Sequence, residues 1–391
     1  MNGAAPTAPA AEDEKSHGIQ VFAAPSDAPR VRWRTDLISA GFSSFLLFLL
    51  ILVAGNGSTL DTNTLTFIGT LPGWLLWLGQ AAYVVGVLYA FALLIGVGFF
   101  ARGRLELLRD MLLAATLAIV GVVLLTRFID DRWPEFAIFD LNQTRETFPA
   151  FFITTSTAIQ AAASPHLTAP MRKVGWTFIL AAIGASVLGA VSTVSDTLGG
   201  LLVGLIAAAL IRYAFGTSAG LPSTNRVRAG LADLGVHVDD LEYTPEQPEA
   251  SIVLTGTSTD GDALFVSGLG RDSWSSRRWT RWWKAAWYQD QGSQYGSDRR
   301  QQIEHEALTM LIADQGGAPV PPLVTIGMTA RDDALLIAGL LDRTLADVSA
   351  DDVDDDLLDA MWGALDALHG AGLSHGSLDS VHVWFDSTGA P

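Results

Sequence analysis

The chain has 391 residues, 49% of them hydrophobic, and it contains no cysteine, which excludes disulfides, thiolate metal sites and a cysteine nucleophile. Its formal net charge of −17 is unevenly spread, because residues 1–220 carry 13 basic and 14 acidic side chains whereas residues 221–391 carry 11 and 27. An acidic surface repels polyanions, so we expect no nucleic-acid partner.

The first segment, residues 1–35, is rich in Ala, Pro, Asp and Glu and has no apolar run near its start. This composition predicts a disordered cytoplasmic tail and not a cleaved signal peptide.

Six apolar stretches follow within residues 36–216. A helix needs roughly 17–25 apolar residues to cross a bilayer, and the third and fourth stretches are the shortest, at about 15–16. We therefore expect an all-α, six-span transmembrane domain. The stretches are Leu37–Val53, Trp74–Phe100, Met111–Leu125, Phe148–Ala163, Val174–Val191 and Thr197–Phe215.

Basic residues mark alternate connections between these stretches, as cytoplasmic loops do. The pattern predicts a multi-pass protein of the inner or plasma membrane with both termini in the cytoplasm. These residues are Arg30, Arg32, Arg34, Arg102, Arg104, Arg109, Arg172, Lys173, Arg212, Arg226 and Arg228.

The fourth stretch is unusually polar, with Thr154, Thr155, Ser156, Thr157 and Gln160. Such side chains form hydrogen bonds between membrane helices. The sharper alternative is a polar groove for a lipid headgroup.

Residues Leu188–Leu205, LGAVSTVSDTLGGLLVGL, resemble the last signature of the type 2 phosphatidic acid phosphatase family. Members of that family use a histidine nucleophile, a second histidine as acid and base, and cations that neutralise the phosphate. Alignment on Asp196 puts Ser192 at the nucleophile position, Ser186 at an arginine position and Phe152 at the second histidine. The resemblance, over roughly residues 70–216, therefore implies a phosphatase-like scaffold without hydrolytic activity. Asp196 itself is interpreted as a helix N-cap or, alternatively, as a retained contact to a lipid headgroup.

Residues 217–250 are interpreted as a linker with one short helical patch, and residues 251–391 as a cytoplasmic α+β domain. The expected strands are Ile252–Thr255, Ala263–Val266, Leu323–Ile326, Ala334–Ala338 and Val381–Phe385, with two helices between the second and third and one near Asp355–Ala371.

Within this domain Leu368–Leu378, LHGAGLSHGSL, is similar to the catalytic loop of aminoglycoside phosphotransferase-like and atypical kinases. There an aspartate is the base and an asparagine holds Mg²⁺. Here these positions are Ser377 and His382. Glu306 matches the helix glutamate that pairs with a strand lysine, but the lysine position is Ser267. The resemblance implies a kinase-like domain without activity, cofactor or metal.

Three further features of this half were weighed against simpler alternatives. Asp379 is a displaced base or a solvated loop acid, and the His305 and His375 pair lacks the spacing of a metal site. Residues 271–288, RDSWSSRRWTRWWKAAWY, predict a basic helix with an aromatic face. That face packs on the kinase-like lobe or lies in the membrane interface.

The order of the two halves resembles the N-terminal part of actinobacterial-type proteins that continue into a lysylphosphatidylglycerol-synthase-like, flippase-like domain. On this resemblance the kinase-like domain is incomplete at its C-terminus. We expect a non-catalytic membrane protein that binds or senses lipid in a cell-envelope lipid system, with membrane lipids and a partner membrane protein or flippase-like domain as partners. The alternatives are an ATP-dependent phosphotransferase or lipid phosphatase with unorthodox residues, and a scaffold for a partner transporter.

Overall fold

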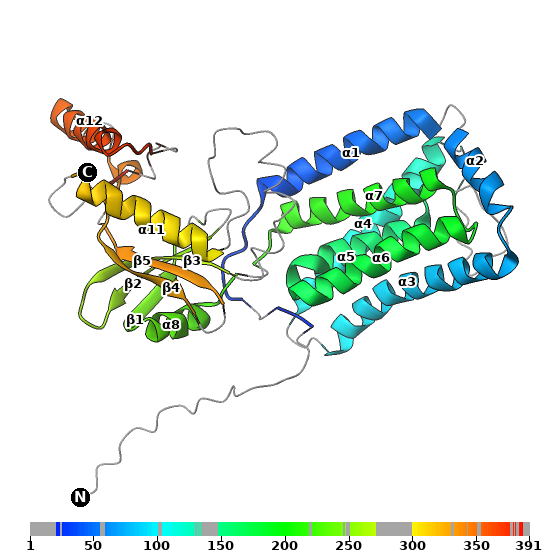
Figure 1. The fold of residues 1–391 in the computed structure, drawn as a ribbon, viewed down its shortest axis with the longest axis horizontal. Coiled ribbons are helices and arrows are strands. Elements are labelled where there is room, and N and C mark those ends of the chain that lie inside the picture. The colour runs from blue at the N-terminus through cyan, green and yellow to red at the C-terminus, as the bar shows by residue number, and fades with distance from the viewer. Residues whose placement is uncertain are drawn as a thin grey trace, which may run out of the picture.

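A helical bundle and a sheet-containing domain make up the molecule (Figure 1). The structure, a computed structural model, describes residues 21–23, 26–54, 59–100, 104–129, 131, 133, 148–218, 221–244, 247, 251–270, 299–329, 332–341, 343–349, 353–375, 378, 380 and 383–385.

Five helices of the bundle are long and apolar enough to cross a membrane. Much of their surface is apolar and exposed, as in α1, where Phe45, Phe48 and Val53 are each more than half exposed. The expectation of a membrane protein is confirmed at this level. The helices are α1 (Arg34–Ala54), α3 (Gly73–Phe100), α4 (Leu105–Ile129), α6 (Ala169–Leu188) and α7 (Val194–Phe215).

The expected fourth span is shorter than a bilayer requires, so the count of six spans is not confirmed. This segment forms α5 (Phe151–Ala163), whose 13 residues extend about 20 Å. Eleven of them are buried, and α5 packs against α4 and α7. Because protein and not lipid surrounds α5, this helix needs neither the length nor the apolar surface of a span.

The helices of the bundle nevertheless run alternately between two ends. We call the end beside the sheet domain the near end and the opposite one the far end. At the near end Val31 and Thr217 form an antiparallel bridge, so the segments before α1 and after α7 emerge together. A short helix, α2 (Thr59–Ile68), lies at the far end (Figure 1).

Two glycines allow α7 to approach α5 closely. A Cβ atom on Gly204 would lie 2.6 Å from the carbonyl oxygen of Thr154, and one on Gly200 would lie 2.9 Å from that of Ala150. Small residues at such spacing bring helix backbones together in membranes. Hydrogen bonding by the polar α5 side chains is mostly local, since Thr154 and Thr155 donate to carbonyls one turn earlier.

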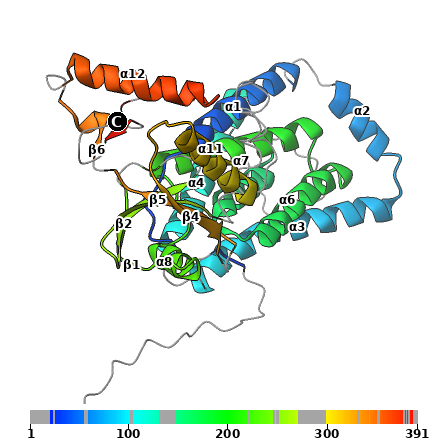
Figure 2. The same cartoon turned by 60° about the vertical axis from the view of Figure 1, so that its left-hand side comes forward.

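The second domain contains a five-stranded antiparallel sheet with strand order β1-β2-β3-β5-β4. In both views α8 (Thr224–Asp233) and α11 (Arg299–Gln315) lie on opposite sides of it (Figures 1 and 2). The strands are β1 (Val238–Tyr243), β2 (Ile252–Ser258), β3 (Ala263–Leu269), β4 (Leu323–Met328) and β5 (Ala334–Gly339); β6 (Arg343–Thr344) and β7 (Trp384–Phe385) form a separate pair, and α12 (Asp355–Gly370) stands beside them.

The expected linker, residues 217–250, differs from the structure, because α8 and β1 belong to the sheet domain. Val227 and Leu231 of α8 and Leu241 of β1 are buried in one core with β2, β3 and β5. The sequence pattern does not predict β1, because β1 is an edge strand in which only Leu241 is buried and three residues are acidic.

Part of the expected N-terminal tail is also ordered. Residues 21–23 and 26–33, which we call the strap, connect the two halves. Phe22 forms a bridge with Leu167 at the near end of the bundle, whereas Ala28 is buried in the core of the sheet domain. The Asp27 Oδ1 atom accepts hydrogen bonds from the Thr224 backbone N–H (2.9 Å) and the Tyr243 hydroxyl (3.1 Å).

Candidate functional site

The positions suggested by the phosphatase resemblance converge at the far end of the bundle. The α6–α7 turn carries Ser192 and Asp196, and the Ala150 backbone N–H just before α5 donates to the Asp196 carbonyl at 2.9 Å. Ser186, Ser192 and Asp196 are all buried. The alignment therefore identified side chains that are neighbours in space.

Ser186 and Ser192 form a closed hydroxyl cluster with Thr197. The Thr197 Oγ1 atom lies 2.7 Å from the Ser192 hydroxyl and 3.2 Å from the Ser186 hydroxyl. Thr197 donates to the Thr193 carbonyl and Ser186 to the Ile183 carbonyl. The Ser192 proton therefore goes to a neutral hydroxyl, and a serine with no base is a weak nucleophile. The motif comparison did not identify Thr197, although the sequence places it four residues, one helical turn, after Thr193.

Asp196 stabilises the start of α7, but it is not the N-cap. Thr193 is the N-cap, and its side chain accepts from the Asp196 backbone N–H at 3.1 Å. The Asp196 carboxylate accepts from the Thr193 N–H at 3.3 Å, which completes a capping box. The Asp61 carboxylate of α2 also accepts from the Ser195 N–H, a contact that no local pattern predicts.

The electrostatics of this end oppose phosphate binding. Two carboxylates, Asp61 and Asp196, already interact with the N-terminus of α7, where an anionic ligand would otherwise bind. In the described residues 59–72, 126–129, 131, 133, 148–150 and 189–196 the one basic side chain is Arg127, which pairs with Asp131. Stabilising a transferring phosphate requires cations, which these residues do not supply.

Phe152 takes the place of the second catalytic histidine. Its side chain packs against the apolar cluster of Tyr83, Val87, Ile153, Ala182 and Ala185. A phenyl ring carries no titratable proton, so this position cannot act as an acid or a base.

In the sheet domain Ser267 lies on β3 and Glu306 on α11. Ser267 is paired with Val253 and Leu336 of the neighbouring strands, and the Glu306 side chain is exposed. In kinases a lysine on this strand contacts the nucleotide phosphates and pairs with the helix glutamate. A serine has no positive charge and so can make neither of these ionic contacts. Ser377, Asp379 and His382 lie outside the described residues.

An aromatic contact covers the face of β3 that carries Ser267. Phe265 lies two residues before Ser267, so both side chains point to the same face. The Phe265 and Trp384 rings meet edge to face, with their centroids 6.4 Å apart, and connect the large sheet to the β6–β7 pair. The contact joins residues far apart in sequence, so the sequence alone did not predict it.

Neither connection around β2 provides a phosphate-binding glycine loop. Gly256–Gly261 forms the end of β2 and a tight turn into β3, in which the Ser258 N–H donates to the Asp262 carbonyl. The sequence between β1 and β2, residues 244–251, has two prolines, two glutamates and no glycine. The Gln247 side chain holds this segment through bonds with both backbone groups of Val253.

An apolar pocket of about 440 Å³ lies beside α12. Its wall includes Pro319–Pro321, the α12 residues Leu358, Trp362 and Leu365, and His375. The His375 imidazole is the one ionisable group among the described residues of this wall. His305, the other histidine considered, is exposed on α11. Among the described residues there is no group of three His, Cys, Asp or Glu side chains that could hold a metal.

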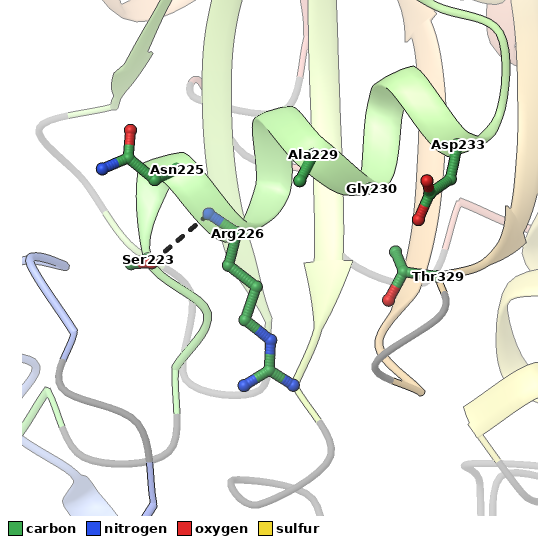
Figure 3. Close-up of a pocket in the computed structure, with 7 residues that line it drawn as sticks. All are labelled: Ser223, Asn225, Arg226, Ala229, Gly230, Asp233 and Thr329. Carbon is green, nitrogen blue, oxygen red and sulfur yellow. Dashed lines mark hydrogen bonds between the residues drawn. The ribbon is translucent and has the colours of Figure 1, made fainter. Parts of the chain in front are cut away.

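A smaller pocket of about 280 Å³ follows α8 (Figure 3). Asp233 and Thr329 line one end of it and Ser223 the other, and the Arg226 side chain points away from Asp233. The Arg226 guanidinium makes a bidentate ion pair with Asp333, whose side chain is 2% exposed. Because that cation is neutralised, we assign this region to the attachment of α8 and not to ligand binding.

Comparisons with known proteins leave the family open. No family model matches the chain, and no curated protein matches its sequence. A solved structure described as the structure of vaccinia related kinase 3 matches 39% of this chain and 44% of that chain, with 16% identity and a TM-score of 0.23. The similarity to a protein kinase is thus weak and partial. The Trp-rich segment 271–288 lies outside the described residues.

Proposed function

We propose that this chain is a non-catalytic membrane protein that binds lipid through its helical bundle and transmits the lipid state to a kinase-like domain without activity. The observation that carries the proposal is that, among the described residues, the far end of the bundle has no activated nucleophile and β3 has Ser267 at the lysine position, while the surroundings of both are well packed. On the resemblance in module order alone, we place it in a cell-envelope lipid system of the lysylphosphatidylglycerol synthase and flippase-like type.

The far end of the bundle supports binding without hydrolysis. The Ser192 hydroxyl bonds to the Thr197 hydroxyl, the Asp196 carboxylate accepts from the Thr193 N–H as part of a capping box, and Phe152 lies in an apolar cluster. Phosphate transfer needs an activated nucleophile and cations arranged around the phosphate. Neither requirement is met by the described residues of this end.

The sheet domain supports a regulatory role in the same way. Ser267 replaces the phosphate-binding lysine, and the Phe265–Trp384 contact covers the face of β3 that carries Ser267. The strap gives this domain a physical connection to the bundle, because Asp27 and Ala28 bind to the sheet domain while Phe22 binds beside α6.

The proposal is tested on the purified full chain with three measurements. Phosphate release from phosphatidic acid should equal the background, the thermal melting temperature should not rise with Mg-ATP, and native mass spectrometry should detect retained phospholipid. Phosphate release abolished by Asp196→Ala would establish the lipid phosphatase alternative. Stabilisation by Mg-ATP that disappears in Glu306→Ala would establish the phosphotransferase.

A purely structural scaffold is the remaining outcome. It would be indicated by a stoichiometric partner protein that copurifies with the chain while no lipid is retained. Arg228→Gln, an exposed position on α8, serves as the control variant in these measurements and should behave as the wild type does.

A further inference from the structure

Cations are concentrated at the near end of the bundle. The described residues 28–36, 104–110, 164–173 and 212–217 contain eight Arg and Lys side chains and three acidic ones. Membrane proteins carry such an excess where they meet the cytoplasmic leaflet. These cations can be divided into those that contact other groups of the protein and those that do not.

Five of the eight cations have partners inside the protein, and these partners include all three acids. The remaining three, Arg32, Arg34 and Lys173, are exposed and have no acidic partner among the described residues. The internal contacts are Arg30 with Glu106, Arg109 with Asp110 and the Phe215 ring, Arg212 with Asp36, Arg104 with the Ala23 carbonyl and the Phe22 ring, and Arg172 with the Ser164 and Leu167 carbonyls.

The three remaining cations lie where lipid-facing surfaces end. Residues three and four apart share a helix face, so Arg34 continues the stripe of Leu37 (49% exposed) and Ile38 (47%) on α1. Lys173 likewise precedes the exposed Leu180 on α6. Phospholipid headgroups occupy this level, just beyond the apolar surface of a span.

Arg32 and Arg34 belong to the part of the chain that joins the two halves. Trp33 between them is buried (6% exposed) and Val31 is paired with Thr217, so the backbone that carries both arginines is held in place. Both also lie at the positive end of the α1 dipole, which disfavours an unneutralised cation and favours an anion.

We propose that Arg32 and Arg34 bind the phosphate groups of anionic phospholipids in the leaflet next to the sheet domain, and that this contact stabilises the strap. The proposal rests on the lipid binding proposed above and names the lipid class and the residues. Binding at Arg32 and Arg34 holds the strap residues that follow Asp27, and so couples the lipid composition to the attachment of the sheet domain.

The first test measures lipid preference. Native mass spectrometry of the full chain in detergent, titrated with phosphatidylglycerol or phosphatidylcholine, gives the affinity ratio for the two lipids. Because each basic residue contributes roughly a fivefold factor near an anionic surface, Arg32→Gln/Arg34→Gln should lower the ratio by about 25-fold. Arg32→Lys/Arg34→Lys keeps both charges and should retain most of the preference. An unchanged ratio in the Gln variant overturns the proposal.

The second test measures the strap itself by hydrogen–deuterium exchange in nanodiscs. Phosphatidylglycerol should slow exchange of the Val31 N–H, which is bonded to the Thr217 carbonyl, and the Gln variant should lose this effect. Lys173→Gln removes a cation at the same level but outside the strap, so it should reduce lipid preference while leaving the strap effect intact. Equal protection by phosphatidylcholine would overturn the coupling.

Two further outcomes identify the source of the anion and separate this inference from the proposed function. Glycerol phosphate or inorganic phosphate that reproduces the protection in phosphatidylcholine discs would assign the arginines to a soluble anion and overturn the phospholipid assignment. Catalytic turnover at the far end would refute the proposed function without changing the lipid preference. If the wild-type protein shows no preference for phosphatidylglycerol over phosphatidylcholine, this inference is refuted while the proposed function still stands.

Discussion

The polar side chains at the two ends of the bundle differ in whether they are paired within the protein. At the far end, hydroxyls and carboxylates bind to one another and to the start of α7, as in the Ser192–Thr197 and Asp196–Thr193 contacts. At the near end, three cations pair with the three acids, two more bind backbone carbonyls, and three further cations are exposed. The difference teaches that a cluster of polar side chains can satisfy its own hydrogen bonds and so be closed to a ligand, whereas cations without an internal partner remain free to bind an external anion.

The largest expected effect is at the buried ion pair of the near end. Arg212 and Asp36 side chains are 18% and 13% exposed, and Arg212 also donates to the Ala161 carbonyl at 2.9 Å. Asp36→Asn should lower the free energy of unfolding by about 3–5 kcal/mol, because it leaves a buried cation uncompensated. The measurement is an SDS unfolding titration in mixed micelles.

The control for this prediction is an exposed pair on α11. Arg300 bonds to Glu304 one turn later, with both side chains largely exposed. Arg300→Gln should cost no more than about 0.5 kcal/mol. Equal costs for the two variants would show that the near-end pair is solvated and would weaken the contrast between internal and outward cations.

A smaller effect is expected between the two ends, where α5 and α7 meet. Gly204→Val places atoms within 3 Å of the Thr154 carbonyl and of the Thr157 side chain, so overpacking should cost about 1–3 kcal/mol. Gly184→Val on α6, where a Cβ meets no atom within 4 Å, is the matched control. Thermal melting in detergent measures both. An unaltered melting temperature for the Gly204 variant would mean that the helices can separate without loss.

At the far end the expected effects are about 1 kcal/mol. Thr193→Ala removes the acceptor of the Asp196 N–H and half of the capping box, which typically costs 0.5–2 kcal/mol, about 1 on average. The same SDS titration measures it. Phosphatidic acid should not rescue the variant, because Asp61 and Asp196 repel it. Rescue by that lipid would show that this end still binds a phosphate.

The bundle was largely predictable because long apolar runs require helices in a bilayer. The exception, α5, shows the limit of that argument: its Thr, Ser and Gln residues are buried by α4 and α7, and no property of the segment alone reveals which neighbours enclose it. The motif alignment singled out Ser186 and Ser192, whose hydroxyls both contact Thr197. Asp61, more than a hundred residues away, could not be found in that way.

Strands β2, β3, β4 and β5 were predictable because their apolar runs are short and bounded by turn residues. Strand β1 and the strap were not predictable, since half of the residues in Val238–Tyr243 are acidic and the sequence of residues 21–33 is typical of a Pro- and Ala-rich tail. Both obtain their structure from partners, Leu241 in a shared core and Asp27 in bonds to Thr224 and Tyr243. Tertiary contacts of this kind leave no periodicity in the sequence.

A further expected effect is a pH dependence at the near end of the bundle. Burial, followed by the nearby Arg104, lowers the pKa of His166 from 6.5 to about 4, with Glu106 opposing and Arg30 reinforcing the shift. The unfolded chain therefore binds a proton below pH 6.5 that the folded protein does not bind until about pH 4. Stability should fall as the pH decreases through this window.

His166→Gln should reduce the fall in melting temperature between pH 6.5 and pH 4, since the imidazole proton is no longer taken up on unfolding. Asp27 does not interfere in this window. Burial would raise its pKa, but hydrogen bonds from Thr224 and Tyr243 outweigh burial and hold that pKa below 3.8, so its contribution is lost only at lower pH. If the His166→Gln variant keeps the wild-type pH dependence of the melting temperature, another group titrates in this window. The near end would then not be the pH-sensitive end of the bundle.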